Sequence, residues 1–225
     1  MPRTDASSAR LPIAGVIFDC DGTLVDSEPL NARGVADLFA TDHGVTLDAR
    51  AIEAEFRGGR FETMTRTLAE RHDVQLANDF TERYRQHMYD LFERELKAMP
   101  GVHDAIQAID LPKCVASSGP EKKLGVALNS TGLADYFGEL VFSAYTIGAW
   151  KPEPDLFLLA AAAMDVEPSA CAVIEDSDAG VEAGRRAGMR VFGYDPGGAI
   201  GHHPAARLTR FTDFNDLPGL ITAAR

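Results

Sequence analysis

The apolar residues follow different periods in different parts of the chain. Residues 13–18 form a short, β-branched apolar run that ends in acid, which predicts a buried parallel strand. From about residue 29 to 95, apolar positions recur at helical spacing in four stripes. Beyond residue 100, short apolar runs alternate with helical stretches. This pattern predicts strands at 113–117, 140–143, 171–174, 190–194 and 207–211, and helices at 102–109, 120–130, 154–164 and 178–187.

Strands that alternate with helices predict an α/β fold with a doubly wound, mainly parallel, Rossmann-like sheet. The first strand ends at residue 18 and the next begins near 113, although a βαβ unit needs only about 30 residues. The intervening stretch therefore predicts an inserted all-α domain. We expect residues 1–27 and 97–225 to form a discontinuous α/β core and residues 28–96 to form the helical insertion, with hinges at residues 26–28 and at Pro100-Gly101.

Acidic residues outnumber basic ones, which limits the expected partners. The 225 residues include 34 acidic and 22 basic ones, a formal net charge of −12. This charge disfavours a general electrostatic grip on nucleic acid or on an anionic membrane. A metal and a few cations can still reverse the field locally around an anionic substrate. No apolar run approaches the ~18 residues of a membrane-spanning helix, so we expect neither nucleic acid nor membrane as a partner.

The cysteines and the first residues indicate the compartment. Cys20, Cys114 and Cys171 show no metal-ligand spacing and lie in apolar contexts, as small buried residues in a reducing environment do. The first ten residues lack the apolar segment of a secretory signal. We expect a cytoplasmic protein, as a monomer or a weak oligomer.

Two aspartates directly follow the first predicted strand. Asp19 and Asp21 are separated by one residue and followed by Gly22 and Thr23, so one tight turn holds both carboxylates. Open α/β sheets bind ligands at this end of their strands, and unpaired carboxylates there would raise each other's pKa. A hard divalent cation removes the conflict, so that one acid can attack while the other handles a proton. The alternative is a solvated Asp-rich turn, which is common after strands.

Two later strands lead into polar turns of the same kind. Ser117, Ser118 and Gly119 bring a hydroxyl and backbone N–H groups to a helix start, which suits a phosphate group but equally suits an ordinary helix cap. Lys151 lies in a stiff, proline-flanked turn ahead of a helix, where a simply exposed lysine is the default.

A second pair of acids follows the strand predicted at 171–174. Glu175 and Asp176 stand at consecutive positions, where carboxylates are costly to desolvate unless they are paired with a cation. A metal held by Asp19, the backbone carbonyl of Asp21 and Asp176 explains all these placements at once.

Taken together, these motifs resemble those of the haloacid dehalogenase superfamily phosphatases, in the branch that has a helical cap inserted after the first motif. Within it, the chain is most similar to the group of 6-phosphogluconate phosphatases and β-phosphoglucomutases, and the stretches 136–143 and 150–152 are closest to the former. The resemblance spans nearly the whole chain and includes all four family motifs: Asp19-Cys20-Asp21-Gly22-Thr23, Ser117, Lys151-Pro152-Glu153-Pro154-Asp155 and Glu175-Asp176-Ser177-Asp178-Ala179-Gly180.

The resemblance implies a mechanism and a set of ligands. Asp19 attacks phosphorus and becomes an aspartyl-phosphate, and Asp21 protonates the leaving alcohol and later deprotonates water. Ser117 holds the transferring oxygens and Lys151 supplies fixed positive charge. Mg²⁺ is held by Asp19, the Asp21 carbonyl and Asp176, with Glu175 either a direct ligand or behind one. The substrate is a small phosphate ester, and its contacts in the core are expected from Gly22, Thr23, Ser118 and Gly119.

Recognition of the leaving group is expected from the helical insertion. Arg57, Gly58, Gly59 and Arg60 combine glycines that allow close approach of a ligand with two guanidinium groups that can hold a second anionic group. The alternative is a solvated turn between helices.

Three other functions compete with phosphate ester hydrolysis. By resemblance, β-phosphoglucomutases carry a histidine in the first cap helix, where this chain has Asn31. A haloacid dehalogenase needs no metal, yet Glu175 and Asp176 provide ligands for one. A non-catalytic protein on this fold would be expected to lack Asp19 or Asp21, and both are present. We therefore expect a phosphatase, with the mutase as the main alternative.

Overall fold

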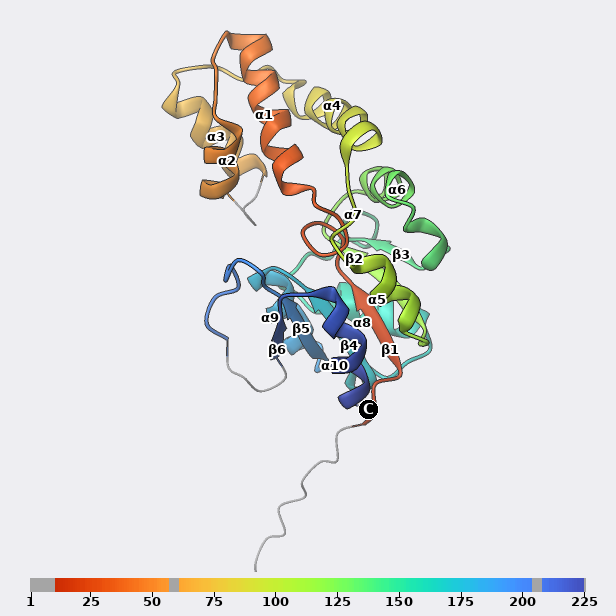
Figure 1. Ribbon diagram of the computed structural model, residues 1–225. Helices are drawn as coiled ribbons and strands as arrows, with labels where there is room; N and C mark the ends of the chain where they lie inside the picture. Colours follow the sequence, from red (N-terminus) through yellow and green to blue (C-terminus); the bar gives the residue numbers. More distant parts are fainter. Residues whose placement is uncertain (1–10, 57–60, 204–207, 225) are drawn as a thin grey trace, which may run out of the picture.

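A computed structural model of the protein describes residues 11–56, 61–203 and 208–224 (Figure 1). At its centre is a six-stranded sheet in the order β3-β2-β1-β4-β5-β6, in which every neighbouring pair is parallel. The strands are β1 (Gly15–Phe18), β2 (Lys113–Ser117), β3 (Val141–Ser143), β4 (Cys171–Glu175), β5 (Arg190–Tyr194) and β6 (Leu208–Phe211). This order confirms the predicted doubly wound α/β fold, because the chain runs outward from β1 to one edge and then from β4 to the other.

Helices cover both faces of the sheet. One face packs against α5 (Val102–Ala108), α6 (Glu121–Ser130) and α10 (Leu217–Ala223), and its apolar cluster includes Phe18 and Ile174. The other face packs against α7 (Ala144–Ile147), α8 (Asp155–Ala163) and α9 (Asp178–Arg186), with Ile17 and Val173 in its cluster. Successive side chains of β1 and β4 thus point to opposite faces of the sheet. Because helices bury both faces, every position of these strands is apolar or buried, which explains their continuous apolar runs. Short 3₁₀ helices occupy Ala134–Tyr136, Pro168–Ala170 and Phe214–Asp216.

Four further helices lie together beyond the carboxyl ends of the strands (Figure 1). They are α1 (Glu28–His43), α2 (Ala49–Phe56), α3 (Phe61–Arg71) and α4 (Phe80–Glu95). The helix α1 contains Pro29 in its first turn and is followed by Gly44, whose φ of 66° is left-handed. The predicted apolar stripes form one cluster with the adjacent face of the sheet.

The chain passes between the sheet and these four helices at one place. Val25 and Ala98 form an antiparallel bridge, and the backbone N–H of Asp26 donates to the carbonyl of Lys97 at 3.0 Å. The two crossing segments therefore lie side by side. Pro100 and Gly101 follow shortly after this pairing and lead into α5, and the hinge expected there stays a prediction.

Most predicted elements agree with the structure to within one or two residues. The strand predicted at 171–174 also includes Glu175, and β1 begins at Gly15 rather than at 13. The helices α7 and α10 are not predicted by the sequence, because α7 has only four residues and α10 begins with Leu217-Pro218-Gly219, which is typical of a turn. The three cysteines are buried and free. In the described part of the chain, no helix has both the length and the apolar character that crossing a membrane requires.

The packing of α1 against α4 generates a stability prediction. Phe39 is fully buried, and its ring meets that of Phe80 edge-on at 5.9 Å between centroids. We expect Phe39→Ala to lower the free energy of unfolding by about 3–5 kcal/mol, because it removes buried apolar contacts and leaves a cavity. Thr41→Ala, an exposed position on the same helix, should change it by less than about 0.5 kcal/mol. Denaturant titrations of both variants measure this, and similar values for the two would contradict it.

Candidate active site

The register between two central strands brings the first acids together. Phe18 of β1 lies beside Ile174 of β4, and the backbone N–H of Asp19 donates to the carbonyl of Ile174 at 2.9 Å. Asp19 therefore emerges next to Glu175 and Asp176 at the same edge of the sheet. One carboxylate oxygen from each of these three residues lies within 4.8 Å of the others. Asp19 and Glu175 are buried, and Asp176 is half-buried.

One lysine lies among these carboxylates. The Lys151 ammonium forms ion pairs with Asp19 and with Glu175, the latter at 2.6 Å, and its side chain is only 4% exposed. The ring of Phe157 lies 4.9 Å from the ammonium. Burial disfavours the charged form of Lys151, but the two carboxylates outweigh this effect and raise its pKa. Lys151 is thus a fixed cation inside the site rather than an exposed surface lysine.

The acidic groups carry more negative charge than Lys151 can balance. Burial raises the pKa of Asp19, against the opposing effect of Lys151. Burial and the neighbouring carboxylates also raise the pKa of Asp176 well above its usual range. Three clustered carboxylates, two of them buried, match the oxygen ligands that hard divalent cations prefer. The chemistry of these donors therefore fits a divalent metal ion.

Glu175 is held on both of its oxygens. Lys151 donates to Oε1, whereas the backbone N–H and the hydroxyl of Ser177 donate to Oε2 at 2.8 and 2.9 Å. The Ser177 hydroxyl also caps α9 by accepting from the N–H of Gly180 at 3.1 Å. Glu175 thus orients Lys151, and its oxygens keep lone pairs beyond these contacts.

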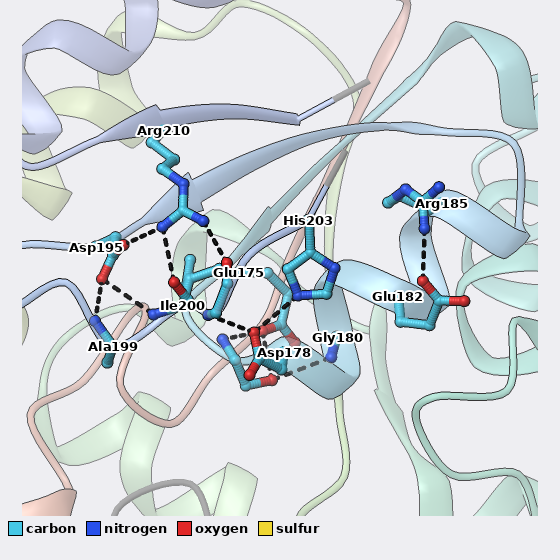
Figure 2. A network of polar contacts seen from close by, with 12 residues as sticks. Glu175, Asp178, Gly180, Glu182, Arg185, Asp195, Ala199, Ile200, His203 and Arg210 are labelled. Atoms are coloured by element: carbon cyan, nitrogen blue, oxygen red, sulfur yellow. Dashed lines mark hydrogen bonds and ion pairs between the residues drawn. The ribbon is translucent and has the colours of Figure 1, made fainter. Parts of the chain in front are cut away.

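The start of α9 is anchored further by a loop that returns to it (Figure 2). Asp178 accepts hydrogen bonds from His203 at 2.8 Å and from the backbone of Gly201 at 2.7 Å. Asp195 pairs with Arg210 at 2.6 Å and so ties the same loop to β6. His203 thus ties this loop to the start of α9.

Two residues of the first motif support Asp176. The Thr23 hydroxyl donates to its Oδ1 at 3.1 Å, and Thr23 is fully buried. Gly22 has a φ of 78°, and a Cβ there would overlap Oδ2 of Asp176. The structure thus gives Gly22 and Thr23 contacts with a carboxylate, and the substrate contacts implied for them by the resemblance remain a prediction.

The second aspartate has polar partners of its own. Asp21 Oδ1 accepts a hydrogen bond from the Ser27 hydroxyl at 2.6 Å and pairs with the Lys123 ammonium at 2.8 Å. Burial disfavours its charged form, but Lys123 and Ser27 outweigh that effect and lower its pKa. A phosphate dianion bound nearby would act in the opposite direction, because a like charge favours the protonated carboxyl.

The turn after β2, residues 117–119, brings a hydroxyl and backbone N–H groups close together, and we call it the cradle. The Ser117 hydroxyl accepts from the N–H of Gly119 at 3.1 Å, and the Ser143 hydroxyl donates to the Gly119 carbonyl at 2.6 Å. Ser118 is exposed next to them, and the N-terminus of α6 follows. Ser117 thus lies at the same strand-end edge as Asp19, where backbone N–H groups can receive an anion.

The loop expected to recognise the leaving group cannot be compared with the structure. Arg57, Gly58, Gly59 and Arg60 lie outside the described residues.

Some contacts of the site do not follow from the motifs alone. Lys123 lies six residues after Ser117 on the predicted helix 120–130. The sequence does not show which face of that helix points toward the site, so the position of Lys123 near the site follows only from the structure. Ser27 and Ser143 each contact the site through one hydroxyl. In the sequence, the only sign of these contacts is that Ser27 follows Asp26 and that Ser143 ends a predicted strand.

Comparison with known proteins covers most of the chain. A family model for hydrolases, of the haloacid dehalogenase-like kind, matches residues 13–188. The chain is 38% identical over 214 residues to a 6-phosphogluconate phosphatase of Escherichia coli. The alignment covers 94% of this chain and 96% of that protein. It is 33% identical over 183 residues to a fructose-1-phosphate phosphatase of the same organism. This alignment covers 78% of this chain and 93% of that protein.

The fold is also found among solved structures. A haloacid dehalogenase-like protein of unknown function from Agrobacterium tumefaciens matches with a TM-score of 0.78 and 30% identity, covering 94% of this chain and 98% of that one. The likeness therefore includes the helices α1 to α4 as well as the sheet.

Gly180 offers a test of how tightly the site is packed. A Cβ at this position would overlap Oε1 of Glu175, whereas a Cβ at Gly125 of α6 would have no atom within 4 Å. Gly180→Ala should lower the free energy of unfolding by about 1–3 kcal/mol. Gly125→Ala should raise it by about 0.5–1 kcal/mol, because alanine favours helix. Equal effects in denaturant titrations would mean that Glu175 moves aside without cost.

Proposed function

Because the chain belongs to the haloacid dehalogenase-like hydrolases, we propose that it is a Mg²⁺-dependent phosphatase of small phosphorylated metabolites, sugar phosphates or phosphosugar acids such as 6-phosphogluconate. The observation that carries the proposal is the position of Asp19, which lies with Glu175, Asp176 and Lys151 at the end of β1. The names of the relatives that match most of the chain support the substrate class.

In the first step, a carboxylate oxygen of Asp19 attacks the phosphorus of the ester. The bond between phosphorus and the ester oxygen breaks, and an aspartyl-phosphate forms on Asp19. Asp21 gives a proton to the departing alcohol oxygen. Lys151, already paired with Asp19, keeps positive charge beside the nucleophile while negative charge moves onto the phosphoryl group.

In the second step, water attacks the phosphorus of the aspartyl-phosphate. Asp21 takes the proton from this water, inorganic phosphate leaves and the carboxylate of Asp19 is restored. The Ser117 hydroxyl and the backbone N–H groups of its turn hold the phosphoryl oxygens in both steps. Positioning and electrostatics account for most of the catalysis in phosphoryl transfer, so the rigidity of this cradle matters.

A bound metal would complete the charge balance of the site. Asp19, the Asp21 carbonyl and Asp176 would hold Mg²⁺, with Glu175 beside them, and when bound the ion supplies positive charge to the transferring oxygens. Thr23 and Gly22 keep Asp176 in place for this role.

The helical insertion is proposed to select the substrate. Residues 28–96 would form a cap over the core formed by 1–27 and 97–225, since α1 to α4 lie beyond the carboxyl ends of the strands (Figure 1). Such a cap can exclude bulk water and contact the leaving group. Within it, the 57–60 segment, with its two arginines, is proposed to bind a second anionic group of the substrate.

Hydrolysis is favoured over mutase chemistry by one residue of α1. Asn31, at the position where the mutases of this group have a histidine, faces the hydroxyl of Tyr84 at 3.4 Å. Its amide neither donates nor accepts a proton in acid–base catalysis, so α1 offers no such group at this position.

Asp19→Asn tests the nucleophile. A carboxamide keeps nearly the same volume but lacks the nucleophilic oxygen, so turnover of 4-nitrophenyl phosphate should become undetectable while the thermal unfolding midpoint stays close to that of the wild type. Mass spectrometry after trapping with a phosphoryl analogue should place the adduct on the wild-type peptide that contains Asp19. Near-normal activity of Asp19→Asn would favour direct attack by water instead.

Metal binding can be tested without activity. At about 100 times its Kd, Mg²⁺ should stabilise the protein by about 2.7 kcal/mol, which raises Tm by roughly 5–10 °C for a chain of this length. Asp176→Asn keeps the volume of the side chain but removes its negative charge, so this variant should lose most of the shift in Tm. Chelation should abolish turnover of the wild type, and added Mg²⁺ should restore it. Full turnover in excess chelator, with bound metal shown to be absent, would contradict the assignment.

A further inference from the structure

A lysine outside the four motifs contacts the proposed acid–base residue. Lys123 lies on α6, and its ammonium is 2.8 Å from Oδ1 of Asp21. Its side chain is 20% exposed, so water covers little of the ion pair. Charge-assisted hydrogen bonds of this kind are shorter and stronger than neutral ones.

The contact determines which oxygen of Asp21 faces the reaction. In the described part of the chain, both polar partners of Asp21 hold Oδ1: the Lys123 ammonium and the Ser27 hydroxyl. The other oxygen, Oδ2, faces Gly119: a Cβ built there would lie 3.5 Å from Oδ2 and 3.5 Å from the Ser117 hydroxyl oxygen. Oδ2 therefore borders the cradle in which the phosphoryl oxygens are proposed to lie.

The lysine also contacts a helix of the insertion. The Phe92 ring of α4 is fully buried, and its centroid lies 5.7 Å from the Lys123 ammonium. An aromatic face attracts a cation at this distance. The neighbouring Lys122 makes a similar contact with the Tyr89 ring at 4.6 Å, but its ammonium is paired with no carboxylate of the site among the described residues.

We propose that Lys123 is a positioning residue that, together with Ser27, fixes the Asp21 carboxyl by its Oδ1 so that Oδ2 delivers the proton to the leaving oxygen. This inference rests on the proposed role of Asp21. It extends the site beyond the four motifs to α6 and, through Phe92, to α4.

The expected effect depends on how much the leaving group needs a proton. An alkyl phosphate leaves as a poor alkoxide and needs the acid, whereas 4-nitrophenolate departs readily without it. We expect Lys123→Met to lower kcat/KM for 6-phosphogluconate or fructose 1-phosphate by about ten- to a hundredfold, as the loss of a charge-assisted contact would. For 4-nitrophenyl phosphate the fall should be at most a few-fold.

Two variants separate positioning from a merely structural role. Lys122→Met removes a lysine of α6 that, like Lys123, contacts an aromatic ring of α4. It should leave both kcat/KM values within about twofold of the wild type. Lys123→Arg keeps a cationic donor and should recover most of the loss on the alkyl ester. Thermal unfolding of each variant shows whether it is folded.

The outcomes distinguish this inference from the function on which it rests. Equal losses on alkyl and aryl esters, or an unchanged kcat/KM in Lys123→Met, would overturn the role of Lys123. Failure of both Lys123→Met and Lys123→Arg to fold would also overturn it, since the lysine would then be structural. If Asp21→Asn keeps full activity on the alkyl ester, the proposed role of Asp21 itself fails. A wild type that hydrolyses only other alkyl phosphates would change the substrate assignment alone.

Discussion

The crowding of negative charge at the ends of β1 and β4 is the constraint on which the rest of the site depends. The parallel register places Asp19, Glu175 and Asp176 within 4.8 Å, and burial makes their mutual repulsion expensive. Lys151 offsets part of it, the Ser177 hydroxyl donates to the second oxygen of Glu175, and the Thr23 hydroxyl donates to one oxygen of Asp176. The glycines at 22 and 180 have no side chain because these carboxylates occupy the space. Much of the local sequence thus follows from one electrostatic problem.

How much of this the sequence predicts depends on the range of the interaction. Strand periodicity and the acids at strand ends are local signals, so the α/β sheet, its helices and the meeting of Asp19 with Asp176 follow from the order of residues alone. Lys151 is harder to place, because only the fold shows that its turn points between Asp19 and Glu175 rather than into solvent. The hydrogen bond from the buried Thr23 hydroxyl to Asp176 is likewise visible only in the fold, since a motif does not reveal which way its side chains point.

Lys123 shows where sequence reasoning stops. The apolar pattern predicts its helix, but the contact with Asp21 joins positions about a hundred residues apart and depends on how α6 packs on both the sheet and α4. The same limit applies to the exact crossing point between sheet and helices. Pro100-Gly101 carries the stronger turn signal, whereas the backbone pairs at Val25 and Ala98, which no turn residue marks.

That crossing has a consequence for how the molecule can vary. Asp26 and Lys97 are hydrogen-bonded neighbours, so everything between them is a closed loop of roughly 70 residues, and the entropy of closing it is on the order of 4 kcal/mol. This cost rises only with the logarithm of loop length, by about 0.6 kcal/mol for each doubling. The closure entropy therefore changes little with the number of residues attached at this point. Changes in the length of this segment are therefore limited by its packing, since the helices share one apolar cluster with the sheet and Phe92 of α4 contacts Lys123, and much less by the entropy of closing the loop.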